Sequence, residues 1–282
     1  MNISTALAAA AKLEKAGVAD PRREAASLLT LALDKPNTFL IAHPEYELTD
    51  DEASRFESFT ARREKREPFQ YISGKQEFYG LDFEVTPAVL IPRPETEILV
   101  EEAIKELNKL NKPNELCFCE VGVGSGCISV SILANFPNAT AIATDISPEA
   151  IKVARRNATR HNVAHRLTLI EGDLFAGVTE KFDMVVSNPP YVPDCDFAEM
   201  QPEVRNHEPH GALFAGDDGL DAVRRIIANA PERLDAEGLL LMEIGIGQAD
   251  KLRGHFVPSI WDEPEFLSDL QQIERTVKAR LR

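Results

Sequence analysis

The first quarter of the chain carries apolar side chains at helical spacing only. The first recurring set is Ala6, Leu7, Ala10 and Leu13. Asp20 before Pro21 fits an N-cap followed by proline at the first helical position, and Thr49 with Glu52 fits a capping box. No strand run or glycine-rich loop interrupts these helices, so residues 1–75 are expected to form a helical domain that docks a substrate.

The pattern changes after residue 66, where aromatic side chains and a valine flank Gly80. This arrangement predicts a β-hairpin. Two prolines punctuate the segment Ile91–Pro94, and helical spacing resumes after residue 97. We therefore expect a hairpin linker over 76–97 and a further domain over 98–282.

From about residue 115, short apolar runs alternate with helical patterns. The predicted strands are 115–121, 139–145, 166–171, 182–187 and 238–245, and the predicted helices are 126–135, 148–161 and 218–230. Strands that alternate with helices in this way indicate a parallel, doubly wound α/β sheet.

Composition narrows the function. The 282 residues are 44% hydrophobic and carry a net charge of −15, which argues against binding to nucleic acid backbones. No apolar run reaches the roughly 20 residues that span a bilayer, and no basic leader precedes the alanine-rich start, so we expect no membrane partner and no signal peptide. The four cysteines are expected to be small buried hydrophobes in a reducing cytoplasm, and no metal site is predicted.

A glycine-rich loop, EVGVGSG, follows the predicted strand 115–121 and precedes a helix. Glycines there let the backbone turn tightly and approach a ligand. The dinucleotide-binding fingerprint needs a glycine where this chain has Cys127, which disfavours a NAD-dependent oxidoreductase. Without a pyrophosphate to accommodate, the carboxylate of Glu120 can stay near the ligand.

Two more strands end in acids. Asp145 ends the second strand, where a carboxylate can accept both hydroxyls of a ribose, and Asp173 follows the third, where it can accept the amino group of an adenine. Either acid alone could be a helix N-cap. Because the carboxyl ends of parallel strands converge, the loop and both acids together favour a nucleoside site.

A fourth strand, ending at Ser187, runs into Asn188-Pro189-Pro190-Tyr191. Neither proline can extend a ladder, since neither has an N–H, and both stiffen the backbone. The pair therefore fixes the side-chain amide of Asn188 at the strand end.

Together these motifs resemble the class I S-adenosylmethionine-dependent methyltransferases, whose members with this proline signature methylate planar nitrogens. EPFQYISGKQEFYGLDFEV, IPRPETE, EVGVGSG, SNPPY and EVRNHEP with LFAG occur in the order seen in the release-factor glutamine N5-methyltransferases of the HemK type. The resemblance covers residues 67–245 well. It implies a doubly wound, seven-stranded, Rossmann-like α/β sheet over 98–282, with a small all-helical N-terminal domain.

The resemblance also implies the site. The implied cofactor-binding residues are Glu120, Gly122, Val123, Gly124, Ser125, Gly126, Asp145, Ile146, Asp173, Leu174 and Asn188, and the implied substrate-binding residues are Asn188, Pro189, Pro190 and Tyr191. The family usually has Asp where this chain has Glu120, and some relatives have an aromatic residue in place of Leu174. Both departures should alter cofactor affinity more than reaction type.

The implied reaction transfers a methyl group from S-adenosyl-L-methionine to the glutamine of the Gly-Gly-Gln tip of peptide chain release factors. We hypothesise that the Asn188 side-chain oxygen and the Pro189 carbonyl accept the two N–H groups of that glutamine, while Tyr191 packs against the amide. The expected protein is a cytoplasmic monomer without direct nucleic acid contact. Alternatives left open are glutamine methylation of a ribosomal protein, adenine-N6 methylation of nucleic acid, and a nucleotide-binding regulator without catalysis.

Overall fold

The computed structural model describes residues 1–110 and 116–282, so the predicted strand residue Glu115 lies outside the described residues. The chain forms two compact units. The first comprises residues 1–74 and 200–207, and the second comprises residues 75–199 and 208–282.

The first unit is entirely helical in its secondary structure apart from one isolated bridge. Its elements are α1 (Ile3–Ala6), η1 (Leu7–Ala9), α2 (Ala10–Lys15), α3 (Pro21–Leu33), α4 (Asn37–Ala42), α5 (Asp50–Glu64), α6 (Phe69–Ser73) and α10 (Pro202–His207). The capping box at α5 is confirmed, since Thr49 N donates to Glu52 at 2.8 Å and Glu52 N donates to Thr49 Oγ1 at 3.3 Å. Pro21 opens α3 as expected, but Asp20 makes no side-chain capping bond because its own backbone is left-handed, with φ of 48°.

The short helix α10 joins the first unit through an ion-pair cluster. Glu203 accepts hydrogen bonds from Arg63 at 3.0 Å and from Arg66 at 2.6 Å, and Arg63 also donates to Glu24 at 2.8 Å. Arg63 is buried, so its charge depends on these carboxylates. No local pattern sets this segment apart from its neighbours, and the sequence places it within the range 98–282.

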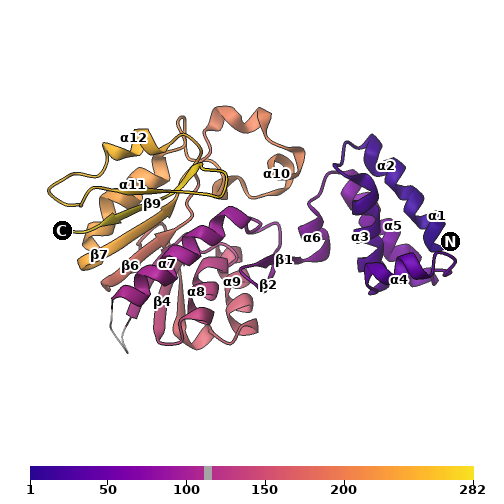
Figure 1. The fold of residues 1–282 in the computed structure, drawn as a ribbon, viewed down its shortest axis with the longest axis horizontal. Helices are drawn as coiled ribbons and strands as arrows, with labels where there is room; N and C mark the ends of the chain where they lie inside the picture. The colour runs from indigo at the N-terminus through magenta and orange to yellow at the C-terminus, as the bar shows by residue number, and fades with distance from the viewer. Residues whose placement is uncertain (111–115) are drawn as a thin grey trace. The chain divides into compact units, whose positions relative to one another are not determined.

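The second unit is built on a seven-stranded sheet of order β5-β4-β3-β6-β7-β9-β8 (Figure 1). The strands are β3 (Leu116–Val121), β4 (Ala139–Asp145), β5 (Leu167–Glu171), β6 (Phe182–Ser187), β7 (Leu234–Glu243), β8 (Glu265–Ser268) and β9 (Glu274–Arg280). The first five correspond to the five predicted strands and are parallel, which confirms the expected parallel, doubly wound arrangement, while β9 runs antiparallel to β7 and β8 at one edge of the sheet. A short link joins β8 to β9, and strands joined by a short turn must be antiparallel.

The predicted hairpin is confirmed as β1 (Lys75–Phe78) paired with β2 (Leu81–Glu84). The remaining elements of this unit are η2 (Pro94–Thr96), α7 (Glu97–Lys109), α8 (Cys127–Asn135), α9 (Pro148–Arg160), η3 (Ala164–Arg166), η4 (Asp194–Glu199), η5 (His210–Ala212), α11 (Asp221–Asn229), η6 (Ala230–Glu232) and α12 (Ala249–Arg253). No helix among the described residues is long and apolar enough to cross a membrane.

Helices cover both faces of the sheet. Alternate strand residues point to opposite faces, and the two resulting cores divide accordingly. Phe118 and Met184 pack with α7, α8 and α9, whereas Cys119 and Val185 pack with α11 and α12. This two-sided burial explains why the central strands read as continuous apolar runs.

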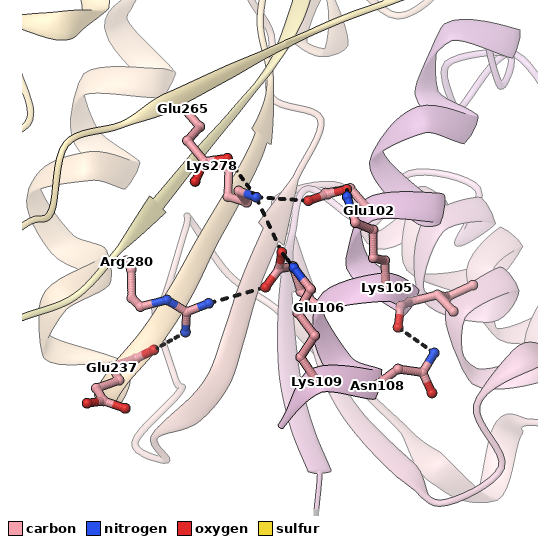
Figure 2. A network of polar contacts seen from close by, with 10 residues as sticks. Glu102, Lys105, Glu106, Asn108, Lys109, Glu237, Glu265, Lys278 and Arg280 are labelled. Carbon is pink, nitrogen blue, oxygen red and sulfur yellow. Dashed lines mark hydrogen bonds and ion pairs between the residues drawn. The ribbon is translucent and has the colours of Figure 1, made fainter. Parts of the chain in front are cut away.

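Where β9 lies against α7, charged side chains form a cluster between the strand and the helix. Figure 2 shows Lys278 of β9 between Glu102 and Glu106 of α7, at 3.0 and 3.3 Å. Arg280 donates to the other oxygen of Glu106 at 3.2 Å. Both glutamates are nearly buried, and Lys278 is 12% exposed. Burial alone would raise the pKa of Glu106, but the hydrogen bonds from Lys109 and Lys278 outweigh it and hold that pKa below its ordinary value.

The four cysteines are free. Cys119 is buried as expected, but Cys195 is exposed, so the prediction of buried cysteines is wrong there. In the described part of the chain, no three His, Cys, Asp or Glu side chains cluster in a way that could hold a metal ion.

Candidate active site

A cavity of about 470 Å³ opens at the carboxyl ends of the parallel strands. The chain passes from β3 to β4 and β5 on one side and then returns to β6 on the other side of β3. Ligands of open α/β sheets bind at such a reversal of strand order. The cavity volume also falls in the range of roughly 300–1,000 Å³ that holds small ligands.

Most of the predicted site residues line this cavity. Those that do are Glu120, Gly122, Val123, Gly124, Ser125, Asp145, Ile146, Asp173, Leu174, Asn188, Pro189 and Pro190. Gly126 and Tyr191 are not among the lining residues. Residues separated by up to 70 positions in the sequence therefore meet around one space, as the convergence of strand ends requires.

The glycines of the loop serve two different functions. Gly122 and Gly124 have φ of 79° and 52°, and a Cβ added to either would meet no protein atom within 4 Å. Since both line the cavity, their missing side chains leave room for a ligand. Gly126 differs, because an added Cβ would lie 3.2 Å from Ala154 Cβ, so this glycine lets α8 pack against α9.

Glu120 places a carboxyl group in the cavity wall. It is 1% exposed, and its Oε2 accepts hydrogen bonds from Ser129 N, at 2.9 Å, and from the Ser129 hydroxyl. Burial raises the pKa of Glu120 to about 8, and the nearby Asp145 charge adds to this rise. A ligand cation would reverse the effect by compensating the buried charge. The site thus suits a ligand that carries an ammonium group.

Asp145 is held by backbone donors on both oxygens. Gly124 N donates to Oδ2 at 2.8 Å, and Ser147 N donates to Oδ1 at 2.9 Å. Burial raises the pKa of Asp145, while the backbone bonds counteract that rise. A carboxylate oxygen has more than one acceptor position, so each can also receive a hydroxyl. Ile146 follows and is 72% exposed, an unusual state for isoleucine that a flat apolar ligand surface would explain.

Asp173 has a partner that the sequence did not reveal. Arg225 of α11 donates to Asp173 Oδ2 at 2.6 Å, and both side chains are about half exposed. Oδ1 has no such bond in the described residues. The next residue, Leu174, has a left-handed backbone with φ of 51°, and its carbonyl accepts a 2.6 Å bond from Thr144 Oγ1. This bond holds a strained residue at the cavity wall.

Asn188 is oriented by residues from other elements. Its Nδ2 donates to Thr96 Oγ1 at 3.1 Å, and that hydroxyl donates to Glu243 Oε2 at 2.6 Å. The Tyr191 hydroxyl donates to the other oxygen of Glu243 at 3.0 Å. Thr96 and Glu243 received no role from the sequence, although Glu243 ends a strand as Asp145 does, and that signal could have drawn attention to it.

Two family models match the chain: the PrmC N-terminal domain over residues 6–74 and the methyltransferase small domain over residues 100–201. A release factor glutamine methyltransferase of Geobacter sulfurreducens is 43% identical over 270 residues, which are 95% of this chain and 93% of that relative.

Solved structures show the same fold at low identity. The hMettl16 catalytic domain, in complex with MAT2A 3'UTR hairpin 6, has a TM-score of 0.56 at 17% identity and covers 82% of this chain and 81% of its own. The T. thermophilus 16S rRNA N2 G1207 methyltransferase RsmC, in complex with AdoMet and guanosine, has a TM-score of 0.54 at 14% identity, covering 74% of this chain and 50% of its own. The second unit therefore has the class I methyltransferase fold that the sequence predicts.

Proposed function

We propose that this chain, which belongs to the release factor glutamine methyltransferase family, methylates a glutamine of peptide chain release factors. The proposed target is the side-chain amide nitrogen of the glutamine at their Gly-Gly-Gln tip. The proposed methyl donor is S-adenosyl-L-methionine. The proposal includes a cytoplasmic monomer whose partners are release factors, not nucleic acid or membranes.

The residues around the cavity fit this donor in charge and in shape. Glu120 offers a buried carboxylate for an ammonium group, beside two glycines whose missing side chains leave open space. Asp145 offers two fixed oxygens for a ribose, and Ile146 and Leu174 offer apolar surface for an adenine. When bound, S-adenosylmethionine supplies an electrophilic methyl group on its sulfonium.

The observation that carries the proposal is the placement of Asn188. This residue lies on the cavity wall at the end of β6, and its NH₂ group is committed to Thr96. Its Oδ1 is therefore available as an acceptor. A primary amide presents two N–H groups in one plane, so Asn188 Oδ1 and the Pro189 carbonyl suit it as a pair of acceptors.

Two fixed acceptors would do most of the catalytic work. An amide nitrogen is a poor nucleophile because its lone pair is delocalised, and acceptors on both N–H groups stabilise the positive charge that it gains during transfer. The prolines keep these acceptors rigid before the substrate arrives, so little reorganisation is needed.

The test is a transfer assay with S-adenosylmethionine labelled in its methyl group. Release factor, its Gln→Ala variant at the Gly-Gly-Gln tip, ribosomal protein and DNA are offered separately. We expect label on the intact release factor alone. Label on ribosomal protein or DNA without label on release factor would overturn the proposed substrate.

A further inference from the structure

Glu243, the last residue of β7, is a buried acid for which the proposed reaction has no direct use. It is 2% exposed, and no cation lies within ion-pair distance of it among the described residues. Its two oxygens instead accept hydrogen bonds from Thr96 Oγ1 and from the Tyr191 hydroxyl. Burying a carboxylate whose hydrogen-bond donors are both neutral is unfavourable, so the position of Glu243 calls for an explanation.

The Glu243 carboxylate determines which group donates in each hydrogen bond that leads through Thr96 to Asn188. An ionised carboxylate can only accept, so the Thr96 hydroxyl proton must point toward Glu243. The Thr96 oxygen is then left with acceptor positions only. Asn188 must therefore present its NH₂ group to Thr96, which it does at 3.1 Å. This sequence of donors and acceptors determines which end of the Asn188 amide faces Thr96.

We infer that Glu243, acting through Thr96, is the positioning residue that decides which end of the Asn188 amide faces the substrate. This inference rests on the proposed function, because only an amide substrate needs an acceptor there. Without an acceptor in place of the Glu243 carboxylate, the Thr96 hydroxyl is free to donate to Asn188. The Asn188 amide would then rotate and turn its NH₂ group toward the N–H groups of the substrate.

Hydrogen bonds also fix Tyr191, which lies in the same segment as Asn188. Its hydroxyl donates to Glu243, and its backbone carbonyl accepts a 2.9 Å bond from Gln248, whose Oε1 accepts from Gly245 N at 2.8 Å. Tyr191 is thus held at its hydroxyl by the last residue of β7 and at its carbonyl by Gln248, which follows that strand. The segment that starts at Asn188 is fixed on one side by Thr96 and on the other by Gln248.

The charge of Glu243 depends on its surroundings. Burial raises its pKa, while the bonds from Thr96 and Tyr191 and the nearby Arg275 of β9 lower it, and Glu95 of η2 adds a weaker rise. The net shift is upward. Acidification should therefore protonate Glu243 and release the Asn188 orientation, so an acid limb in kcat is expected in the wild type.

The test compares Glu243→Leu, Thr96→Val and the control Thr96→Ser. Both test variants remove a hydrogen-bonding group at little change in side-chain size, whereas Thr96→Ser keeps the hydroxyl. We expect kcat for a Gly-Gly-Gln peptide to fall about 100-fold in Glu243→Leu and Thr96→Val, and to stay within about threefold of wild type in Thr96→Ser. The Kd for S-adenosylhomocysteine should change less than about threefold in all of them, and the acid limb should be absent in Glu243→Leu.

A second readout separates this inference from the proposed function. In protein with ¹⁵N-labelled asparagine and a labelled Thr96 methyl group, a nuclear Overhauser effect between the Asn188 NH₂ protons and that methyl is expected in the wild type and not in Glu243→Leu. If the wild type methylates no glutamine, the proposed function is refuted. The Overhauser effect would then still show whether Glu243 sets the orientation of the Asn188 amide.

Three outcomes overturn the inference. They are a kcat within about threefold of wild type in Glu243→Leu, equal kcat values in Thr96→Val and Thr96→Ser, or the same Overhauser effect in wild type and Glu243→Leu. If Glu243→Leu fails to fold, as judged by circular dichroism, the pair of Thr96 variants decides.

Discussion

Cofactor binding should expel a proton from Glu120. Burial raises the pKa of this carboxyl to about 8, so about 90% of the molecules carry it neutral at pH 7. The proposed partner is an ammonium group, which needs the ionised form. At pH 7 we therefore expect about 0.9 proton to be released for each cofactor bound.

The size of the effect follows from the same shift. The ionised fraction of Glu120 rises from about 1% at pH 6 to about 50% at pH 8, so affinity should rise about 50-fold over this interval. Glu120→Gln cannot titrate and serves as the control. Titration of the ligand's own amino group is common to both proteins and cancels in the ratio of their Kd values.

Isothermal titration calorimetry measures both quantities. S-adenosylhomocysteine, which keeps the amino group, is titrated in buffers of different ionisation enthalpy between pH 6 and 9. The proton released by wild type should be absent in Glu120→Gln, and the ratio of the two Kd values should grow toward pH 8. No proton release at pH 7, or the same pH slope in both proteins, would refute the assignment of Glu120 to the ammonium group.

The free protein offers a check on the pKa itself. A carboxyl whose folded pKa is raised favours folding where it is protonated, so its contribution is fully present below the unfolded value and is lost as pH rises to about 8. Glu120→Gln should therefore gain stability relative to wild type as pH rises from 5 to 8, by up to about 4 kcal/mol. Equal stability of the two proteins across this range would contradict the raised pKa.

Three further predictions concern other parts of the second unit. Asn188→Ala should lower kcat at least about 100-fold, because the amide acceptor is removed, while the Kd for S-adenosylhomocysteine stays within about threefold of wild type. Steady-state kinetics measures the first quantity and calorimetry the second. Near-normal turnover would exclude the acceptor role. Lys278→Met leaves Glu102 and Glu106 without their buried cation and should cost about 3 kcal/mol in urea unfolding. Lys105→Met removes an ammonium group that is 59% exposed and should cost clearly less, and equal losses would show that burial does not matter there. Gly124→Ala should weaken cofactor binding more than Gly126→Ala does. Gly126→Ala should lower the melting temperature more, since only the Cβ added at Gly126 meets Ala154. The reverse order in both measurements would contradict the different functions assigned to the two glycines.

The central strands were predictable because they are buried on both faces. β4 over 139–145 and β6 over 182–187 have the predicted bounds, since each is a short apolar run between turn residues. β7 begins at Leu234 and not at 238, because its first half is polar and interrupted. Its register against β6 shifts there, and Glu237 has a left-handed backbone with φ of 60°. An irregularity of this kind breaks the period that reveals a strand.

The parts of the candidate site that could be predicted are the acids that directly follow or end a strand. Asp145 and Asp173 could be placed together because parallel strands bring their carboxyl ends to the same edge. The partners that orient Asn188 and Asp173 could not be predicted. Thr96 and Glu243 lie 147 positions apart, and Arg225 is 52 positions from Asp173. Such contacts arise from tertiary packing, which a local pattern does not encode.

The most direct test of the account is to locate the transferred methyl group. The protein is incubated with S-adenosylmethionine and a release factor, and the release factor is then digested and sequenced by tandem mass spectrometry. The account predicts the added mass of one methyl group on the side chain of the glutamine in the Gly-Gly-Gln tip, and none when Asn188→Ala replaces the wild type. A methyl group on any other residue, or an unmodified tip with active cofactor present, would contradict it.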